Sequence, residues 1–293
     1  GTSSKTVSSY NFAPDFLWGK NRSDTSIGWW LYDTTRGAGA NKELGTHQDY
    51  AEGADNMDTY GYLSAFTSNG FTGVNGSGSP NYYFNKSSST YVAFGLKANG
   101  GTTSSNTSGS ITSTVQANTT SGFSIATYTG NGTTNATVGH GLGVAPKMII
   151  VKARSGGSAW EVYHSGLSSG YTIYLNSTGA QTQISGTNGG GLGAPSSSVI
   201  NFTNGILNNN NVNENGVTWV AYSFAEIAGY SKFGSYTGNG STDGTFVYTG
   251  FRPKFIMVKC SSNSSTNWFI LDTTRDTYNL SGQSLMPNLN NAE

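Results

Sequence analysis

"APKMIIVK", residues 145–152, is the stretch that decides the fold, because two similar stretches occur elsewhere in the chain. "APDFLWGK" occupies residues 13–20 and "RPKFIMVK" occupies residues 252–259, and in each copy a lysine follows the proline by six residues. A short apolar run bounded by proline and polar residues is typical of a β-strand that is buried on both faces. The three copies therefore predict three equivalent buried strands.

A tryptophan follows each of these prolines at a nearly constant distance of 15, 14 and 15 residues. The repeated positions are Pro14, Lys20 and Trp29 in the first copy, Pro146, Lys152 and Trp160 in the second, and Pro253, Lys259 and Trp268 in the third. Three coincident positions with such regular spacing indicate homologous units. We interpret all nine residues as structural repeat positions.

Further matches show where the units differ. "NKSSSTYVAFGLKA" from Asn85 aligns with "NENGVTWVAYSFAE" from Asn213, and the turn motif "YTGNG" occurs at Tyr128 and again at Tyr236. The third unit has no counterpart of "YVAF", and the first unit begins within its own turn motif at Gly1. We expect that the chain is a segment of a longer array, or that another chain completes the third unit.

The pattern as a whole predicts an all-β protein with tandem antiparallel β-sandwich domains, jelly-roll-like, and little or no helix. Only residues 46–63 have a pattern that would allow a short helix. The domains expected are a first sandwich at 1–100, a Ser/Thr/Gly-rich connector with room for an extra strand at 101–122, a second sandwich at 123–234, and a partial third repeat at 235–293.

Composition excludes several classes of protein. The 15 basic and 15 acidic residues balance, which argues against a nucleic-acid partner. No apolar run approaches the roughly 20 residues that span a bilayer, so no membrane insertion is expected. The single cysteine, Cys260, cannot form an intrachain disulfide or a cysteine-built zinc site. We expect no cofactor and no metal.

The polar repeat positions do not indicate catalysis. Asp33, His164 and Asp272 occupy one equivalent place, four residues after each tryptophan, yet a carboxylate and an imidazole cannot fill the same acid–base role. We interpret them as strand-end side chains that bind turn amides, and the "DTTR" motifs from Asp33 and Asp272 as local turn pairs worth about 0–1 kcal/mol. The sequence therefore predicts no catalytic residue and a non-enzymatic protein.

The repeated lysines allow two interpretations. Each could contact an anionic ligand, or could lay its stem over the nearby tryptophan with the ammonium at the rim. Because the position recurs in every unit, the architectural interpretation is favoured.

A loop that differs between the units is the candidate binding site. Tyr82, Tyr83 and Phe84 stand where the second unit has "NNNNVN", and exposed loop aromatics commonly stack on sugar rings or dock a partner. The alternative is that these rings pack against the next unit or a neighbouring chain.

The motifs together resemble a repeat domain of uncharacterised function in virion structural, tail-fibre-like proteins of marine phages, cyanophages in particular. The resemblance is carried by "GSITSTVQANTTSGFSIATYTGNG", "VGHGLGVAPKMIIVKARSGGSAWEVYHSG", "PDFLWGKNRS", "LYDTTRG" and "YVAFGLKANG". It implies a virion structural protein, a fibre or appendage segment on the virion surface or in the extracellular space, with no family catalytic residues to carry over. The partners implied are other copies of the chain or other virion proteins, with adhesion to host-surface glycan as a further expectation.

Two alternatives stay open. One is a secreted or cell-surface adhesin or filament protein built from the same modules. The other, less favoured, is a polysaccharide depolymerase, which would require a pair of carboxylates that the repeats do not provide.

Overall fold

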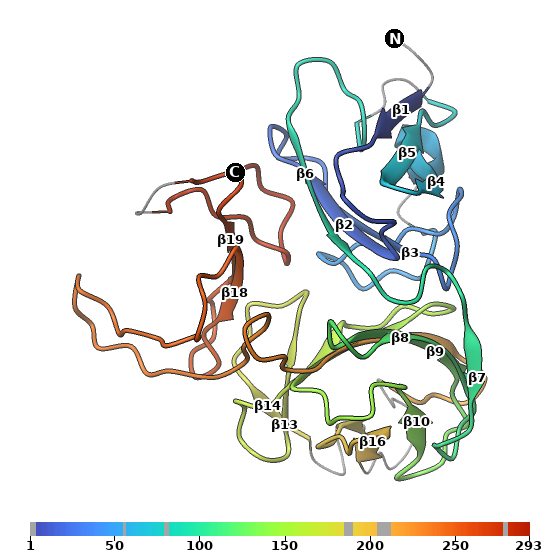
Figure 1. Ribbon diagram of the computed structural model, residues 1–293, viewed down its shortest axis with the longest axis vertical. Coiled ribbons are helices and arrows are strands. Elements are labelled where there is room, and N and C mark those ends of the chain that lie inside the picture. The colour runs from blue at the N-terminus through green and yellow to red at the C-terminus, as the bar shows by residue number, and fades with distance from the viewer. Residues whose placement is uncertain (1–3, 55–56, 79–81, 185–189, 204–211, 278–280) are drawn as a thin grey trace.

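The three predicted units lie around a common centre in a computed structural model (Figure 1). The first unit is blue to cyan in the figure, the second runs from green through yellow to light orange, and the third is orange to red. The structure describes residues 4–54, 57–78, 82–184, 190–203, 212–277 and 281–293. Gly1, and the parts of the loop motifs that fall at 79–81 and 204–211, lie outside the described residues.

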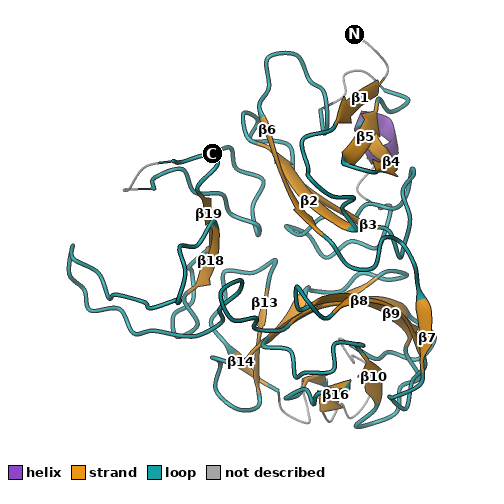
Figure 2. Cartoon of the chain, viewed as in Figure 1, coloured by secondary structure: helices purple, strands orange, loops and turns teal. Residues whose placement is uncertain are grey.

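Strands and loops make up nearly all of the described chain (Figure 2). Every pairing between named strands is antiparallel, so the all-β prediction is confirmed. One helix, α1 (Met57–Tyr60), falls inside the stretch that allowed a short helix.

The first unit is a small two-sheet sandwich. One sheet has the order β3-β2-β6 and the other the order β1-β5-β4. A cluster of buried side chains that includes Leu17, Trp30 and Phe71 fills the space between them. The strands are β1 (Ser4–Val7), β2 (Phe16–Asn21), β3 (Trp29–Asp33), β4 (Tyr62–Thr67), β5 (Gly70–Val74) and β6 (Tyr91–Leu96).

The second unit is larger. An eight-stranded sheet with the order β14-β13-β12-β11-β17-β9-β8-β7 is covered on one face by the sheet β10-β16-β15, with a second buried cluster between them. The strands are β7 (Ser104–Asn106), β8 (Ser113–Asn118), β9 (Phe123–Thr129), β10 (Thr137–Gly139), β11 (Met148–Ala153), β12 (Glu161–His164), β13 (Tyr171–Tyr174), β14 (Thr182–Gln183), β15 (Gly191–Leu192), β16 (Val199–Thr203) and β17 (Thr218–Phe224). Both β7 and β8 lie in the predicted connector. The domain boundaries themselves stay a prediction.

The third unit consists, in the described residues, of the two-stranded sheet β18 (Phe255–Lys259) and β19 (Trp268–Asp272). Every residue of β2 and of β11 is buried, as expected of these strands, whereas β18 has no buried residue. The prediction of burial on both faces is therefore wrong for β18, because no second sheet covers it within the described chain.

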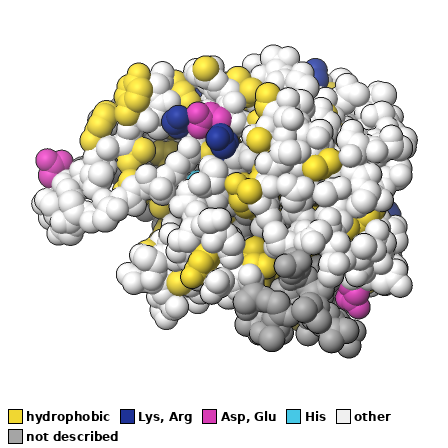
Figure 3. Space-filling view, turned by 90° about the horizontal axis from the view of Figure 1, so that it is seen from below, with side chains coloured by type: hydrophobic (Ala, Val, Ile, Leu, Met, Phe, Trp, Pro, Cys, Tyr) yellow, Lys and Arg dark blue, Asp and Glu magenta, His cyan; other side chains and the backbone are white. Residues whose placement is uncertain are grey.

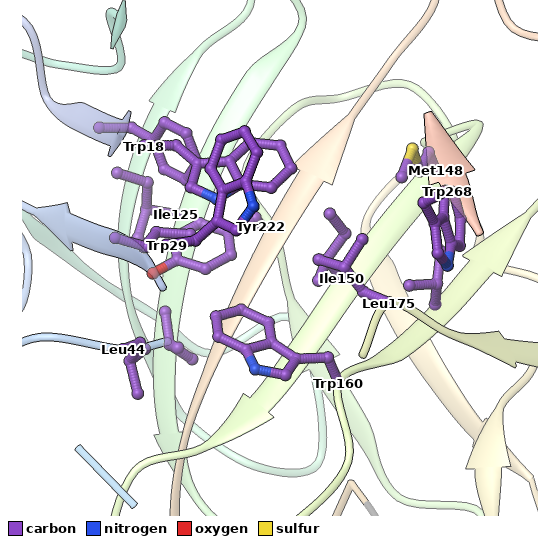
Figure 4. Packing of buried hydrophobic residues seen from close by; sticks show 14 of the residues in the cluster. Trp18, Trp29, Leu44, Ile125, Met148, Ile150, Trp160, Leu175, Tyr222 and Trp268 are labelled. Atoms are coloured by element: carbon purple, nitrogen blue, oxygen red, sulfur yellow. The ribbon is translucent and has the colours of Figure 1, made fainter. Parts of the chain in front are cut away.

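The inner faces of all three units share one core. One buried cluster contains the repeated tryptophans of all three units, Trp29, Trp160 and Trp268. It also contains Leu44 and Leu175, each 15 residues after the tryptophan of its own unit. Figure 4 shows Trp160 between Leu44 of the first unit and Ile150 and Leu175 of its own, with Trp268 beside Met148. The units are therefore packed into one body.

Candidate functional site

The repeated tryptophans join each unit to a neighbour. Each indole Nε1 donates a hydrogen bond to a backbone carbonyl oxygen of another unit. The bonds run from Trp29 to Met286 (2.9 Å), from Trp160 to Gly45 (3.0 Å) and from Trp268 to Tyr174 (3.0 Å). The first unit thus binds the third, the second binds the first, and the third binds the second, which closes a ring.

The repeated lysines follow the same ring. Each Nζ donates to a carbonyl oxygen four residues beyond the one that its tryptophan contacts. The bonds run from Lys20 to Asn290 (3.1 Å), from Lys152 to Asp49 (3.2 Å) and from Lys259 to Thr178 (3.3 Å). Each lysine also donates to the carbonyl oxygen of the residue that follows it in its own strand.

The ammonium groups lie inside the protein. Lys20 and Lys152 are fully buried, and burial lowers the pKa of each to about 8, against a smaller opposing effect of Asp24 or Asp49. The expected position at the rim is therefore wrong for these two. Lys20 contacts three carbonyl oxygens, of Asn21, Ile27 and Asn290, so its three donors are used. This geometry supports the architectural interpretation over an anionic ligand.

We call each of these three contacts between units a joint. Every joint also has a backbone hydrogen bond, donated by the residue three positions after the one whose carbonyl oxygen accepts from the lysine. The amide nitrogens of Glu52, Gln181 and Glu293 donate to the carbonyl oxygens of Arg154, Ser261 and Arg22, at 2.9, 2.8 and 3.0 Å. Two of the joints add an ion pair. Arg154 Nε lies 2.6 Å from Glu52 Oε2, and Arg22 Nε lies 2.7 Å from Glu293 Oε2.

The acceptor segments 45–52, 174–181 and 286–293 were not found by sequence reasoning. Their residues differ because their backbone carbonyl groups and amides make most of the contacts, and a carbonyl places little demand on side-chain identity. The dipeptide Ala-Glu ends two of them, at residues 51–52 and 292–293, but it also occurs at residues 225–226, outside these segments, so it could not have identified them.

Within each unit, the same segment also holds the tryptophan strand. The amide nitrogens of Trp29, Trp160 and Trp268 donate to His47 Nδ1 (3.3 Å), Asn176 Oδ1 (3.0 Å) and Asn288 Oδ1 (3.0 Å). Burial, with a smaller effect of the Lys20 charge, lowers the pKa of His47 to about 4. A neutral imidazole is the form that accepts this hydrogen bond.

The two "DTTR" motifs fold alike, but they are not surface turns. Asp33 and Arg36 are fully buried at side-chain level, with Nε 2.5 Å from Oδ2, and Arg36 also donates to the carbonyl oxygens of Leu31 and Lys42. Tyr222, from the second unit, donates its hydroxyl to Asp33 at 2.7 Å. The expected value of about 0–1 kcal/mol applies to exposed pairs, so it is wrong for this buried pair.

The strand-end side chains do bind turn amides. Asp33 Oδ1 accepts from the amide of Arg36, Asp272 Oδ1 accepts from the amide of Arg275, and His164 Nδ1 accepts from the amide of Gly166, each at 2.9 Å.

The aromatic loop of the first unit is mostly inside. Tyr83 and Phe84 are buried, at 6% and 7% exposure, in the cluster between the two sheets, and Phe84 lies 4.7 Å from the Trp30 ring. Their expected exposure is therefore wrong, because Gly70–Val74 and β3 leave a space that these rings fill. Tyr82 is partly exposed, with Lys86 Nζ 4.6 Å from its ring centroid.

Glu161 is a buried carboxyl group that takes no part in the contacts between units. Its Oε1 accepts from the amide of Leu192 at 2.7 Å, and burial raises its pKa to about 7. It borders a small cavity of about 30 Å³ whose other described lining residues are Thr172, Tyr174, Thr182, Gln183, Ile184, Gly190 and Gly191. None of these described residues is a second acid, and paired carboxylates are what glycoside hydrolysis ordinarily needs.

The fold is that of an antiparallel β protein with three joined units. A family model described as "Domain of unknown function (DUF7483)" matches residues 1–293, and the chain belongs to this family. No curated protein matches the chain, and no solved structure matches it. Among the described residues, no helix is long and apolar enough to cross a membrane.

Proposed function

We propose that this chain is a non-enzymatic structural protein of a phage virion, a segment of a fibre or appendage on the particle surface. The observation that carries the proposal is the use made of the repeated side chains. The tryptophans and lysines that recur in every unit are occupied in holding the units to one another. Because the repeated side chains bind other units of the same chain, they favour a structural role over a catalytic one.

The resemblance of the quoted motifs to virion repeat domains supports the particle as the place where the chain works. The test is mass spectrometry of particles purified by density gradient from an infected culture of the source host. The chain should co-purify with capsid proteins at constant ratio through the gradient. Its presence only in the particle-free medium or on uninfected cells would overturn the virion assignment in favour of a secreted adhesin or filament.

Adhesion to host-surface glycan is the second part of the proposal. Tyr82 is the one residue of the aromatic loop that keeps exposed surface, while Tyr83 and Phe84 fill the core of the first unit. The variant Tyr82→Ala should therefore weaken binding to host cells and leave the melting temperature within a few degrees. Tyr83→Ala serves as the contrasting variant, since it should lower the melting temperature itself. Unchanged adsorption by Tyr82→Ala would exclude this loop as the adhesive site.

The enzymatic alternative has its own test. A depolymerase would release reducing sugar from host polysaccharide, and the release would fall on Glu161→Gln substitution. Sugar release by the purified chain would overturn the non-enzymatic proposal.

A further inference from the structure

Apolar side chains of the third unit are exposed where the equivalent residues of the second unit are buried. Ile256 is 42% exposed, whereas Ile149, at the same place in its strand, is fully buried. Tyr236 is 55% exposed, whereas Tyr128, at the same place in "YTGNG", is 5% exposed. The third unit therefore presents surface that the fold elsewhere covers.

More apolar surface adjoins these residues in the sequence. The exposed set also includes Phe246, Val247, Tyr248, Phe255 and Phe269. Residues 235–254 extend from the body as a two-armed loop in Figure 1, with Thr245 Oγ1 donating to the carbonyl oxygen of Thr237 at 2.8 Å. The third unit lies on the left in Figure 1, and Figure 3 shows hydrophobic side chains gathered on the same side of the molecule. Large exposed apolar patches commonly mark interaction sites.

In the second unit, Ile149 and Tyr128 are covered by the sheet β10-β16-β15. Besides that cover, β18 lacks a neighbouring strand, which the other two units identify. In the second unit, β17 lies between β11 and β9, and in the first unit β6 pairs with β2 at the same edge. In the third unit, β18 is paired with β19 alone among the described residues. The segment with Tyr236, which corresponds to β9, likewise lacks a strand partner in the described chain. A single strand inserted between β18 and the Tyr236 segment would give each of them a hydrogen-bonded neighbour.

The backbone of β18 is oriented to receive such a strand. The Thr273 amide donates to the Lys254 carbonyl oxygen at 3.0 Å, and Ile270, opposite Met257, exchanges both its backbone hydrogen bonds with Leu285. Because successive residues of a strand point their amides to opposite edges, Phe255, Met257 and Lys259 direct theirs away from β19. The unpaired edge therefore offers a ladder of backbone donors and acceptors.

The two complete units specify the occupant. The strand beside β2 is "TYVAF" (residues 90–94) and the strand beside β11 is "TWVAY" (residues 218–222). Both pair in one register: the second aromatic residue faces Trp18 in the first unit and Ile150 in the second, which are the counterparts of Met257. Threonine, aromatic, valine, alanine and aromatic residues thus recur in that order.

We propose that the open edge of β18 binds one further β-strand, from outside residues 1–293, antiparallel, with the pattern Thr-aromatic-Val-Ala-aromatic and with its second aromatic residue opposite Met257. Strand addition of this kind draws its affinity from the backbone ladder and its specificity from alternate side chains. The inference rests on the proposed function as a building block and names the class of its partner.

The experiment uses the 293-residue chain and a fluorescent peptide with the sequence of residues 218–225, flanked by lysines for solubility. Saturable binding is expected, with slowed amide hydrogen exchange at residues 255–259. The matched control carries N-methyl groups on the residues equivalent to Val220 and Tyr222. In the second unit their amides face β11, since Thr218, on the same edge, accepts from Arg154 at 2.7 Å. Loss of these backbone bonds should weaken binding at least ~10-fold.

Three results would overturn the inference. They are absence of binding, equal binding of a scrambled or N-methylated peptide, and slowed exchange at a place other than β18. A chain that is already dimeric by light scattering, with residues 255–259 protected before peptide is added, would instead assign the edge to a second copy. None of these outcomes depends on whether the chain is found in purified particles, so the two proposals fail separately.

Discussion

His47 is the one imidazole in the ring of joints, at a place where the other two units have asparagine. Its Nδ1 accepts the Trp29 amide, as Asn176 and Asn288 accept the amides of Trp160 and Trp268. With a pKa of about 4 in the folded state and about 6.5 ordinarily, the unfolded chain takes up a proton first as the pH falls. His47 therefore lowers the free energy of unfolding as the pH falls from about 6.5 to about 4, by up to about 3 kcal/mol.

The variant His47→Asn tests this directly, because asparagine already does the same work in the other units. Its free energy of unfolding should rise relative to wild type as the pH is lowered from 6.5 to 4, measured by urea denaturation at each pH. At pH 7.5 the two proteins should differ by less than about 1 kcal/mol. A constant difference across this range would mean that His47 does not titrate on unfolding.

Glu161 has the opposite pH dependence. Burial raises the pKa of its carboxyl group to about 7, so the folded state keeps a proton that the unfolded chain loses at about 4.5. Its contribution is fully present below about pH 4.5 and is lost as the pH rises to about 7. Glu161→Gln removes the titration and keeps an oxygen acceptor for the Leu192 amide.

The Gln variant should therefore gain stability relative to wild type as the pH is raised from 4.5 to 7, by roughly 2–3 kcal/mol. The measurement is again chemical denaturation over a pH series. Between about pH 4.5 and 6.5 the effects of His47 and Glu161 oppose each other, so the wild-type curve should be flatter than that of either variant. If Glu161→Gln ran parallel to wild type at every pH, the carboxyl group would have to be ionised in the folded protein.

At the scale of the strand, β3 carries two neighbouring tryptophans with different tasks. Trp29 points to the shared core and donates its indole hydrogen to the Met286 carbonyl oxygen, whereas Trp30 points to the core of the first unit. Both are almost fully buried, and Trp30 Nε1 has no hydrogen-bond partner among the described residues. Replacement by phenylalanine removes a similar volume from each site.

Trp29→Phe should cost about 1–3 kcal/mol more than Trp30→Phe, because only the first change leaves a carbonyl oxygen of another unit without its donor. The free energies of unfolding of the two variants, measured in one buffer, give this difference. Equal costs would mean that the hydrogen bond between the units adds nothing to packing.

The sequence predicted the strands that carry strong apolar patterns. Strands were predicted at the post-proline runs and at the tryptophan stretches, and the structure has β2, β11 and β18 at the first and β3, β12 and β19 at the second. Hydrophobic periodicity and turn residues predict such strands because both are local signals. Local signals of this kind could not predict the contacts between the units. A carbonyl of Gly45 or Tyr174 accepts from an indole more than 90 residues away along the chain, and no periodicity records that contact.

The same limit explains the aromatic loop. Tyr83 and Phe84 look like binding residues when only their polar neighbours in the sequence are considered. Their burial depends on the space left between two sheets, which is set by the positions of β3 and β5. Loop side chains of this kind can be assigned to a core only after the sheets are placed.

At the scale of the whole molecule, a shared core joins the three units, in addition to the buried clusters inside the first and second units. In an array of independent modules, each unit has its own core and melts on its own. Here the three tryptophans belong to one cluster and each is hydrogen-bonded to another unit. Damage to one unit should therefore reach all three.

Trp268→Ala, in the third unit, tests that coupling. The change removes a buried indole and its bond to the Tyr174 carbonyl oxygen, at a cost of about 3–5 kcal/mol. Amide exchange in β2 and β11 should accelerate together with exchange in β18, in a single unfolding transition. Phe246→Ala is the matched control, because Phe246 belongs to the same unit, is 86% exposed, and should change stability by less than about 0.5 kcal/mol. Faster exchange in β18 alone would show that the third unit unfolds independently and that the ring of joints does not couple the units.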